Sequence, residues 1–219
     1  MKSFAKKYPK THRFLKGAGS ALKVAHQAYS MARVVASIVN SERKYFDSSV
    51  AWDTNTTASV TCLTSMAQGD TNVTRNGNSI ALKSLQIHGY WQGDTGVPSE
   101  QVRIMIVRDN DNLGGTAPVI TDVLEGSGVL QLRNKNTPKR FTMLYDKIFV
   151  GSTDSPVKKF DYFKKFRMMK DKNGNPTKSV KCLFDGTTAN DYTRGHIFLI
   201  AVGNTATAST TSTLQLNTR

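Results

Sequence analysis

Residues 75–91 read RNGNSIALKSLQIHGYW, and this stretch indicates the fold of the chain. Asn76 and Gly77 are a two-residue turn signal of the kind that opens β hairpins. Apolar residues then recur at every second position, which is typical of a strand with one buried face. The alternation changes phase once, which predicts a β-bulge near Lys83 or Ser84. The stretch therefore predicts a long strand in the core of a β sandwich.

The same strand-and-turn pattern continues through the rest of the chain after Lys44, where short β-branched or aromatic runs are separated by Gly, Asn, Asp, Ser and Pro. Further strands are expected at residues 102–107, 141–150, 160–168, 180–184 and 196–202, with weaker candidates near 59–63 and 211–216. One short helix is expected within residues 118–126, with Thr121 or Asp122 as its cap. We therefore expect an all-β fold, a single eight-stranded jelly roll (β sandwich).

Positive charge is concentrated at the N-terminal end of the chain. The 219 residues contain 30 Lys plus Arg and 16 Asp plus Glu, which gives a net charge of +14. Residues 1–44 contain ten basic residues and one acidic residue, hence +9, and residues 45–219 contain 20 and 15, hence +5. Such an excess favours a polyanionic partner. We expect a basic N-terminal arm at residues 1–44 and one folded jelly-roll domain at residues 45–219.

The arm has the composition of a segment that binds phosphates. Residues 1–16, MKSFAKKYPKTHRFLK, carry six Lys or Arg and no acid, with aromatic residues between them. From Ser20, an N-cap candidate, apolar residues recur every three or four positions and predict an amphipathic helix at about residues 20–40. One face of it is available either to the folded domain or to another arm. Flexible cations bind nucleic acid without reading its sequence. The expected nucleic-acid-binding residues are Lys2, Lys6, Lys7, Lys10, Arg13, Lys16, Lys23, Arg33, Arg43 and Lys44.

Three blocks in sequence order carry a resemblance to a known family. They are QGDTNVTRNGNSIALKSLQIHGYW (residues 68–91), VRIMIVRDNDNLGGTAPVITDVL (102–124) and KRFTMLYDK (139–147). Their order resembles that in the coat protein of satellite tobacco necrosis virus and in capsid proteins of circular Rep-encoding single-stranded DNA (CRESS-DNA) viruses. ERKYFD, residues 42–47, resembles the arm-to-shell junction of these proteins. The resemblance implies a jelly roll that assembles as about 60 copies into a T=1 icosahedral shell, with the arm facing inward.

The resemblance also implies the partners of the chain, which are further copies of itself and a small single-stranded viral genome. Phosphate neutralisation does not distinguish DNA from RNA, and the family resemblance favours DNA. KKYPK, residues 6–10, is in addition a candidate signal for nuclear import receptors. We expect the protein in the virion and, during assembly, in the host nucleus or cytoplasm. No stretch is apolar enough to predict membrane insertion.

The sequence gives no support for an enzyme or a cofactor. It contains no G-x-x-x-x-G-K-[ST], H-E-x-x-H or G-x-S-x-G motif, so we expect no catalytic residue. His88 and His196 are interpreted as ordinary strand residues because neither has a second histidine at a metal-ligand spacing. Asp109 and Asp111 resemble the start of a calcium loop, but Ile120 stands at the closing Glu position. We expect no cofactor, and a structural calcium ion between subunits can be assigned to no residue.

Two other functions stay open at this stage. A non-viral single-stranded nucleic-acid-binding β protein would share the basic arm but would expose stacking aromatic residues on its folded domain and would form no particles. Alternatively, residues 1–40 resemble an organellar transit peptide ahead of an enzyme or a binding domain, although Lys predominates over Arg.

Overall fold

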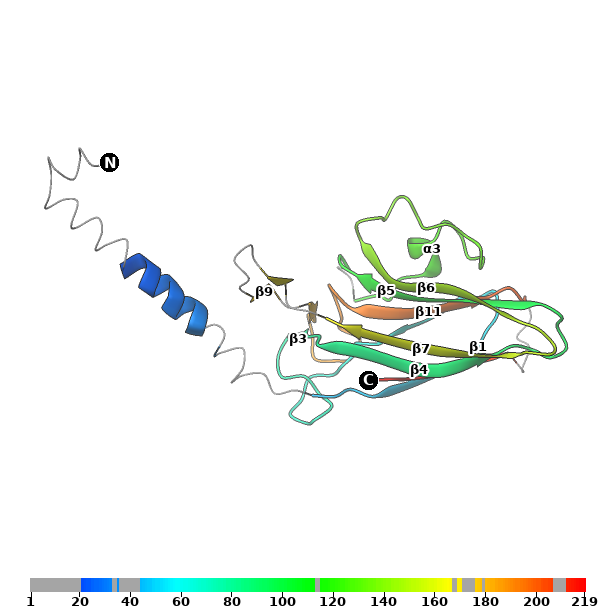
Figure 1. The fold of residues 1–219 in the computed structure, drawn as a ribbon, viewed down its shortest axis with the longest axis horizontal. Helices are drawn as coiled ribbons and strands as arrows, with labels where there is room; N and C mark the ends of the chain where they lie inside the picture. Colours follow the sequence, from blue (N-terminus) through cyan, green and yellow to red (C-terminus); the bar gives the residue numbers. More distant parts are fainter. Residues whose placement is uncertain are drawn as a thin grey trace, which may run out of the picture. The chain divides into compact units, whose positions relative to one another are not determined.

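The computed structural model describes residues 21–32, 35, 44–112, 115–166, 169–170, 176–178, 180–206 and 212–219. The chain divides into two units, Met1–Lys44 and Tyr45–Arg219. In the first unit residues 21–32 are helical and almost entirely exposed (Figure 1), and the remainder of the predicted 20–40 helix, apart from helical residue 35, lies outside the described residues. Over the part of the chain that is described, no helix has the length and apolar character needed to cross a membrane.

The second unit consists of two facing four-stranded antiparallel sheets (Figure 1). The first sheet has the order β1-β12-β4-β7 and the second has the order β2-β11-β5-β6. The folded unit has its first and its last strand in the first sheet, and these two strands pair along their whole length. This topology confirms the predicted all-β jelly roll. The strands are β1 (Ser48–Asp53), β2 (Ser59–Cys62), β4 (Ser84–Gln92), β5 (Glu100–Asp109), β6 (Phe141–Gly151), β7 (Val157–Lys165), β11 (Ile197–Gly203) and β12 (Thr213–Thr218).

Short additional strands make the predicted count of eight too low. β3 (Ser79–Ala81) pairs with β10 (Lys181–Leu183), and β8 (Met169–Lys170) pairs with β9 (Pro176–Lys178). β3 and β4 are the two parts of the single strand that was predicted at residues 80–91. Between them the Lys83 carbonyl accepts a hydrogen bond from the Phe166 amide at 2.8 Å. The phase change near Lys83 therefore marks the point where the chain passes from one sheet to another.

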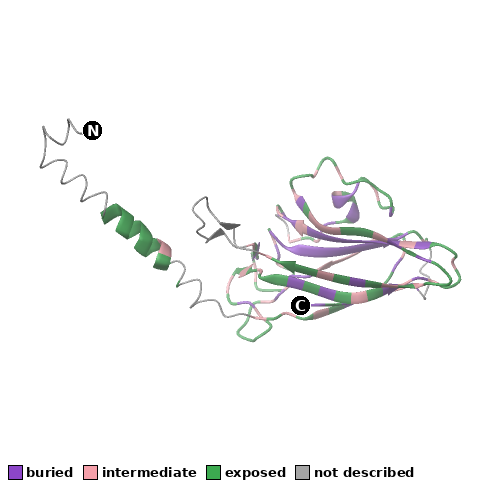
Figure 2. Ribbon diagram, in the orientation of Figure 1, coloured by how far each residue is buried: buried purple, intermediate pink, exposed green. Residues whose placement is uncertain are grey.

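The main core lies between the two large sheets. Trp91 and Ile87 of β4, Phe160 of β7 and Ile104 of β5 are among its fully or almost fully buried side chains. Along β4 buried and exposed residues alternate, whereas β11 is buried at every position (Figure 2). The first sheet therefore has one solvent face, and the central strands β5 and β11 of the second sheet are covered on both of their faces.

The cover over the second sheet is the long connection between β5 and β6, which contains α3 (Ile120–Val123) (Figure 1). Its apolar residues Ile120, Val123 and Val129 form a second buried cluster with Met105 of β5 and Phe198 of β11. A strand that is buried on both faces reads as a continuous apolar run. This explains the runs VRIMIV and IFLIAV, which carry no alternation.

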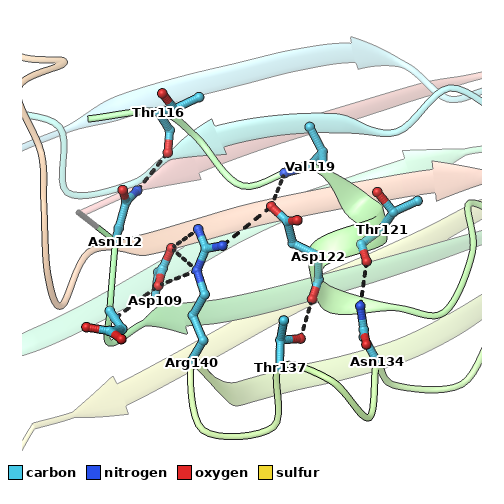
Figure 3. Close-up of polar contacts among 10 residues, drawn as sticks. Asp109, Asn112, Thr116, Val119, Thr121, Asp122, Asn134, Thr137 and Arg140 are labelled. Carbon is cyan, nitrogen blue, oxygen red and sulfur yellow. Dashed lines mark hydrogen bonds and ion pairs between the residues drawn. The ribbon is translucent and has the colours of Figure 1, made fainter. Parts of the chain in front are cut away.

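An ion pair anchors this connection at its two ends (Figure 3). Asp109, fully buried at the end of β5, accepts hydrogen bonds from Arg140 Nε at 3.1 and 3.2 Å and from Arg140 Nη2 at 2.9 Å. Arg140 Nη1 lies 3.7 Å from Asp122 Oδ2. Asp122 also accepts from the Val119 amide at 3.1 Å, so it caps α3 from the third helical position. The predicted N-cap was therefore wrong, since Val119 occupies that place.

A second buried polar group is His196, which directly precedes β11. Its Nε2 lies 2.8 Å from the Leu183 carbonyl, and its Nδ1 lies 3.0 Å from Thr64 Oγ1. Since a carbonyl only accepts, Nε2 carries the hydrogen and Nδ1 accepts from the Thr64 hydroxyl. Burial lowers the pKa of His196 to about 4. The folded domain therefore holds a neutral imidazole at pH 7.

Replacing Arg140 with Met should lower the free energy of unfolding by about 3–5 kcal/mol, because the buried Asp109 carboxylate loses its partner. The double variant Arg140→Met, Asp109→Asn should recover part of this loss, since no unpaired charge remains. Arg194→Met is the matched control: its ion pair with Asp111 is more than half exposed on both sides, and its loss should cost at most about 1 kcal/mol. Denaturant unfolding checks all three, and equal losses for Arg140→Met and Arg194→Met would contradict the account.

The free energy of unfolding should also fall as the pH drops from about 6.5 to about 4. In this window the unfolded chain protonates His196 near its ordinary pKa of 6.5, whereas the folded chain does not until about pH 4. The loss attributable to this group is about 3 kcal/mol. His196→Gln keeps a donor and an acceptor without this titration, so its stability should depend less on pH in the window. Urea unfolding at pH 7 and at about pH 4.5 measures the difference, and identical pH dependence of both proteins would refute it.

Candidate nucleic-acid interface

The structure describes two of the ten arm residues that were predicted to bind nucleic acid. Lys23 is exposed within helical residues 21–32, and Lys44 is half-buried. The other eight predicted residues lie outside the described residues: Lys2, Lys6, Lys7, Lys10, Arg13, Lys16, Arg33 and Arg43. Their role therefore stays a prediction.

A second concentration of positive charge lies within the folded unit, and the sequence analysis missed it. Residues 157–181 contain nine Lys or Arg and two Asp, hence +7. The rest of residues 45–219 contain eleven basic and thirteen acidic residues, hence −2. The signal was present in VKKFDYFKK at residues 157–165. A single division of the net charge at Lys44 averages this basic segment with the acidic remainder of residues 45–219 and so conceals it.

The strand β7 contains the first part of this basic segment and forms one edge of its sheet. Phe160 and Tyr162 point into the core between the sheets. Because successive side chains of a strand point to opposite faces, Lys159, Phe163 and Lys165 lie on the solvent face, and all three are exposed. The alternation of β7 thus separates a set of core aromatic residues from an exposed set of cations and one aromatic ring.

The solvent face continues from β7 across β4 and β12. In the antiparallel register, Tyr90 is opposite Lys159, and Gln86 is opposite Phe163. The Tyr90 hydroxyl donates a hydrogen bond of 2.9 Å to Gln215 Oε1 of β12. We call this surface the polar sheet face, and define it by Gln86, His88, Tyr90, Lys159, Asp161, Phe163, Lys165 and Gln215.

Asp161, the acidic residue in the middle of the polar sheet face, is in contact with His88. Asp161 Oδ1 lies 2.6 Å from His88 Nδ1, and Gln86 Nε2 lies 2.5 Å from His88 Nε2. Of the carboxylates that the structure describes, none lies within ion-pair distance of Lys159 or Lys165. The two ammonium groups are therefore available to an external anion.

Among the residues that the structure describes, no three His, Cys, Asp or Glu side chains lie together in a group that could hold a metal ion. Asp109, which resembled the first ligand of a calcium loop, has its carboxylate bound by Arg140. The chemistry that the described surface supports best is contact with phosphates and bases.

Comparison with known proteins identifies the family. A family model described as satellite tobacco necrosis virus coat protein matches residues 23–218. No curated protein matches the chain. The family match agrees with the two-sheet jelly roll and confirms the resemblance of the three sequence blocks to the satellite tobacco necrosis virus coat protein. Since it covers most of the sequence, the chain belongs to the satellite tobacco necrosis virus coat protein family and is a viral capsid protein.

Proposed function

We propose that the chain assembles into a T=1 icosahedral shell of about 60 copies and packages a small single-stranded genome through its basic arm. The observation that carries the proposal is the family match over residues 23–218, because a coat protein acts as a structural component of the virion. The protein accordingly has no catalytic role in this account.

Exposed apolar side chains support contacts between copies of the chain. Leu130 and Leu132 are each 74% exposed, and Val119 is 57% exposed. All three lie on the connection that contains α3, where the folded unit itself leaves them uncovered. Such side chains on a surface loop suit contacts between subunits in a closed shell.

The charge of the arm supports genome packaging. About 60 arms of +9 would bring roughly 500 positive charges into the shell and neutralise a similar number of phosphates, which suits a genome of about one to a few kilobases. We propose single-stranded DNA rather than RNA on the resemblance to CRESS-DNA virus capsids. Residues 6–10 would then act as a nuclear import signal as well as a phosphate contact.

Replacing the six Lys and Arg of residues 1–16 with Gln should reduce the nuclease-protected nucleic acid per particle by up to about two-thirds, because six of the nine net charges of the arm are removed. The matched control replaces the Lys residues with Arg and the Arg with Lys, which preserves the charge and should preserve the cargo. Negative-stain microscopy, nuclease treatment and sugar analysis of the extracted cargo provide the measurement.

Uniform particles from the unaltered protein, with unchanged cargo in the Gln variant, would contradict the role of the arm. A soluble monomer without protected nucleic acid, across several salt and pH conditions, would instead favour the non-viral single-stranded nucleic-acid-binding protein.

A further inference from the structure

An aromatic ring stands exposed on the first sheet and makes no ring or cation contact with the residues that the structure describes. Phe163 is 65% exposed on β7, whereas Phe160 on the same strand is 1% exposed in the core. A second aromatic residue, Tyr90, lies on the same face at 36% exposure. Its hydroxyl is held by Gln215, which fixes the direction of the ring. The structure thus places two exposed aromatic residues on one sheet face.

The lysines around Phe163 have an alternative explanation that must be weighed. β7 is an edge strand, and lysines on such strands commonly prevent pairing with another chain. This role accounts for Lys159 and Lys165, but it does not account for an exposed phenylalanine between them, which would promote such pairing. The combination of cations with an uncovered ring therefore points to a ligand that needs both.

The geometry of the strand sets the spacing of these groups. Lys165 is two residues and Lys159 four residues from Phe163 on the same face, which corresponds to about 7 and 13 Å along the strand. The β7 edge of the sheet stays positive because the nearby carboxylates are engaged by other residues or lie elsewhere. Asp161 contacts His88, Asp47 is bound by Arg219, and Asp53 lies on β1 at the opposite edge.

Single-stranded nucleic acid combines both features that this surface would recognise. Its phosphates attract ammonium groups, and its unpaired bases stack on aromatic rings without sequence preference. We propose that the polar sheet face is a second binding surface for the packaged single strand, in which Phe163 and Tyr90 stack on bases while Lys159 and Lys165 contact phosphates. The proposal rests on the packaging function above and assigns this face to the interior of the shell.

The test measures binding of a short fluorescent oligodeoxyuridylate and of the matching oligouridylate, which differ only in the sugar, to full-length protein by anisotropy, at several salt concentrations that keep the subunits apart. Phe163→Ala should weaken binding about tenfold with an unchanged salt slope, because stacking is lost and no charge is removed. Phe163→Trp should bind within about twofold of the unaltered protein, since its ring still stacks. The double variant Lys159→Ala, Lys165→Ala should reduce the salt slope by about 1.4, or 0.7 for each lost phosphate contact.

Matched controls come from exposed positions outside the polar sheet face. Val73→Ala removes one exposed apolar side chain, and Lys135→Ala with Lys139→Ala removes two exposed cations, so both should leave affinity and salt slope nearly unchanged. Thermal unfolding of each variant verifies that the fold persists. Tighter binding of one oligonucleotide type identifies the sugar that the surface prefers.

The outcomes separate this inference from the packaging function. If Phe163→Ala binds as tightly as the unaltered protein while the arm Gln variant loses cargo, the inference is overturned and the packaging function stands. If Phe163→Ala prevents particle formation but keeps its affinity for oligonucleotides, the face is a contact between copies, which also overturns the inference. Failure of the unaltered protein to form particles would count against the packaging function itself.

Discussion

The structure depends on one constraint, the burial on both faces of β5 and β11, the central strands of the β2-β11-β5-β6 sheet. On one side Ile104 and Leu199 pack against the other sheet, and on the other side Met105 and Phe198 pack against the connection that contains α3. Burial of apolar area is the largest favourable contribution to folding, so this sheet holds the remaining layers in place. The Arg140–Asp109 ion pair then ties down the connection that supplies the outer cover.

The apolar runs of the chain lie in the β2-β11-β5-β6 sheet. The β1-β12-β4-β7 sheet is built from alternating segments instead and therefore keeps one face in solvent. That face combines the lysines of β7 with Phe163 and Tyr90. A coat protein has two kinds of partner, copies of itself and a genome, and they make different chemical demands. The exposed apolar residues of the α3 connection suit the first, and the basic segments of the chain suit the second.

Much of the fold could be predicted from the sequence because alternation and continuous apolar runs report burial directly. Strand β1 was not predicted, since SSVAWD is short and begins with polar residues, and it is stabilised by pairing with β12, which is distant in sequence. The break between β3 and β4 depends on two hydrogen bonds, from the Leu82 amide to the Val180 carbonyl and from the Phe166 amide to the Lys83 carbonyl, which alternation cannot reveal. The interface was predicted only in the arm, because the lysines of β7 became one surface only when their register with β4 was known.

The most direct test of the account is a cryo-electron microscopy reconstruction of particles purified from full-length protein. The account predicts a closed icosahedral shell of about 60 jelly rolls, with the solvent face of the β1-β12-β4-β7 sheet turned towards the interior and in contact with density for nucleic acid. A shell in which this face points outward would contradict the genome contact proposed for Phe163. The absence of any closed particle under assembly conditions would contradict the capsid function at the centre of the account.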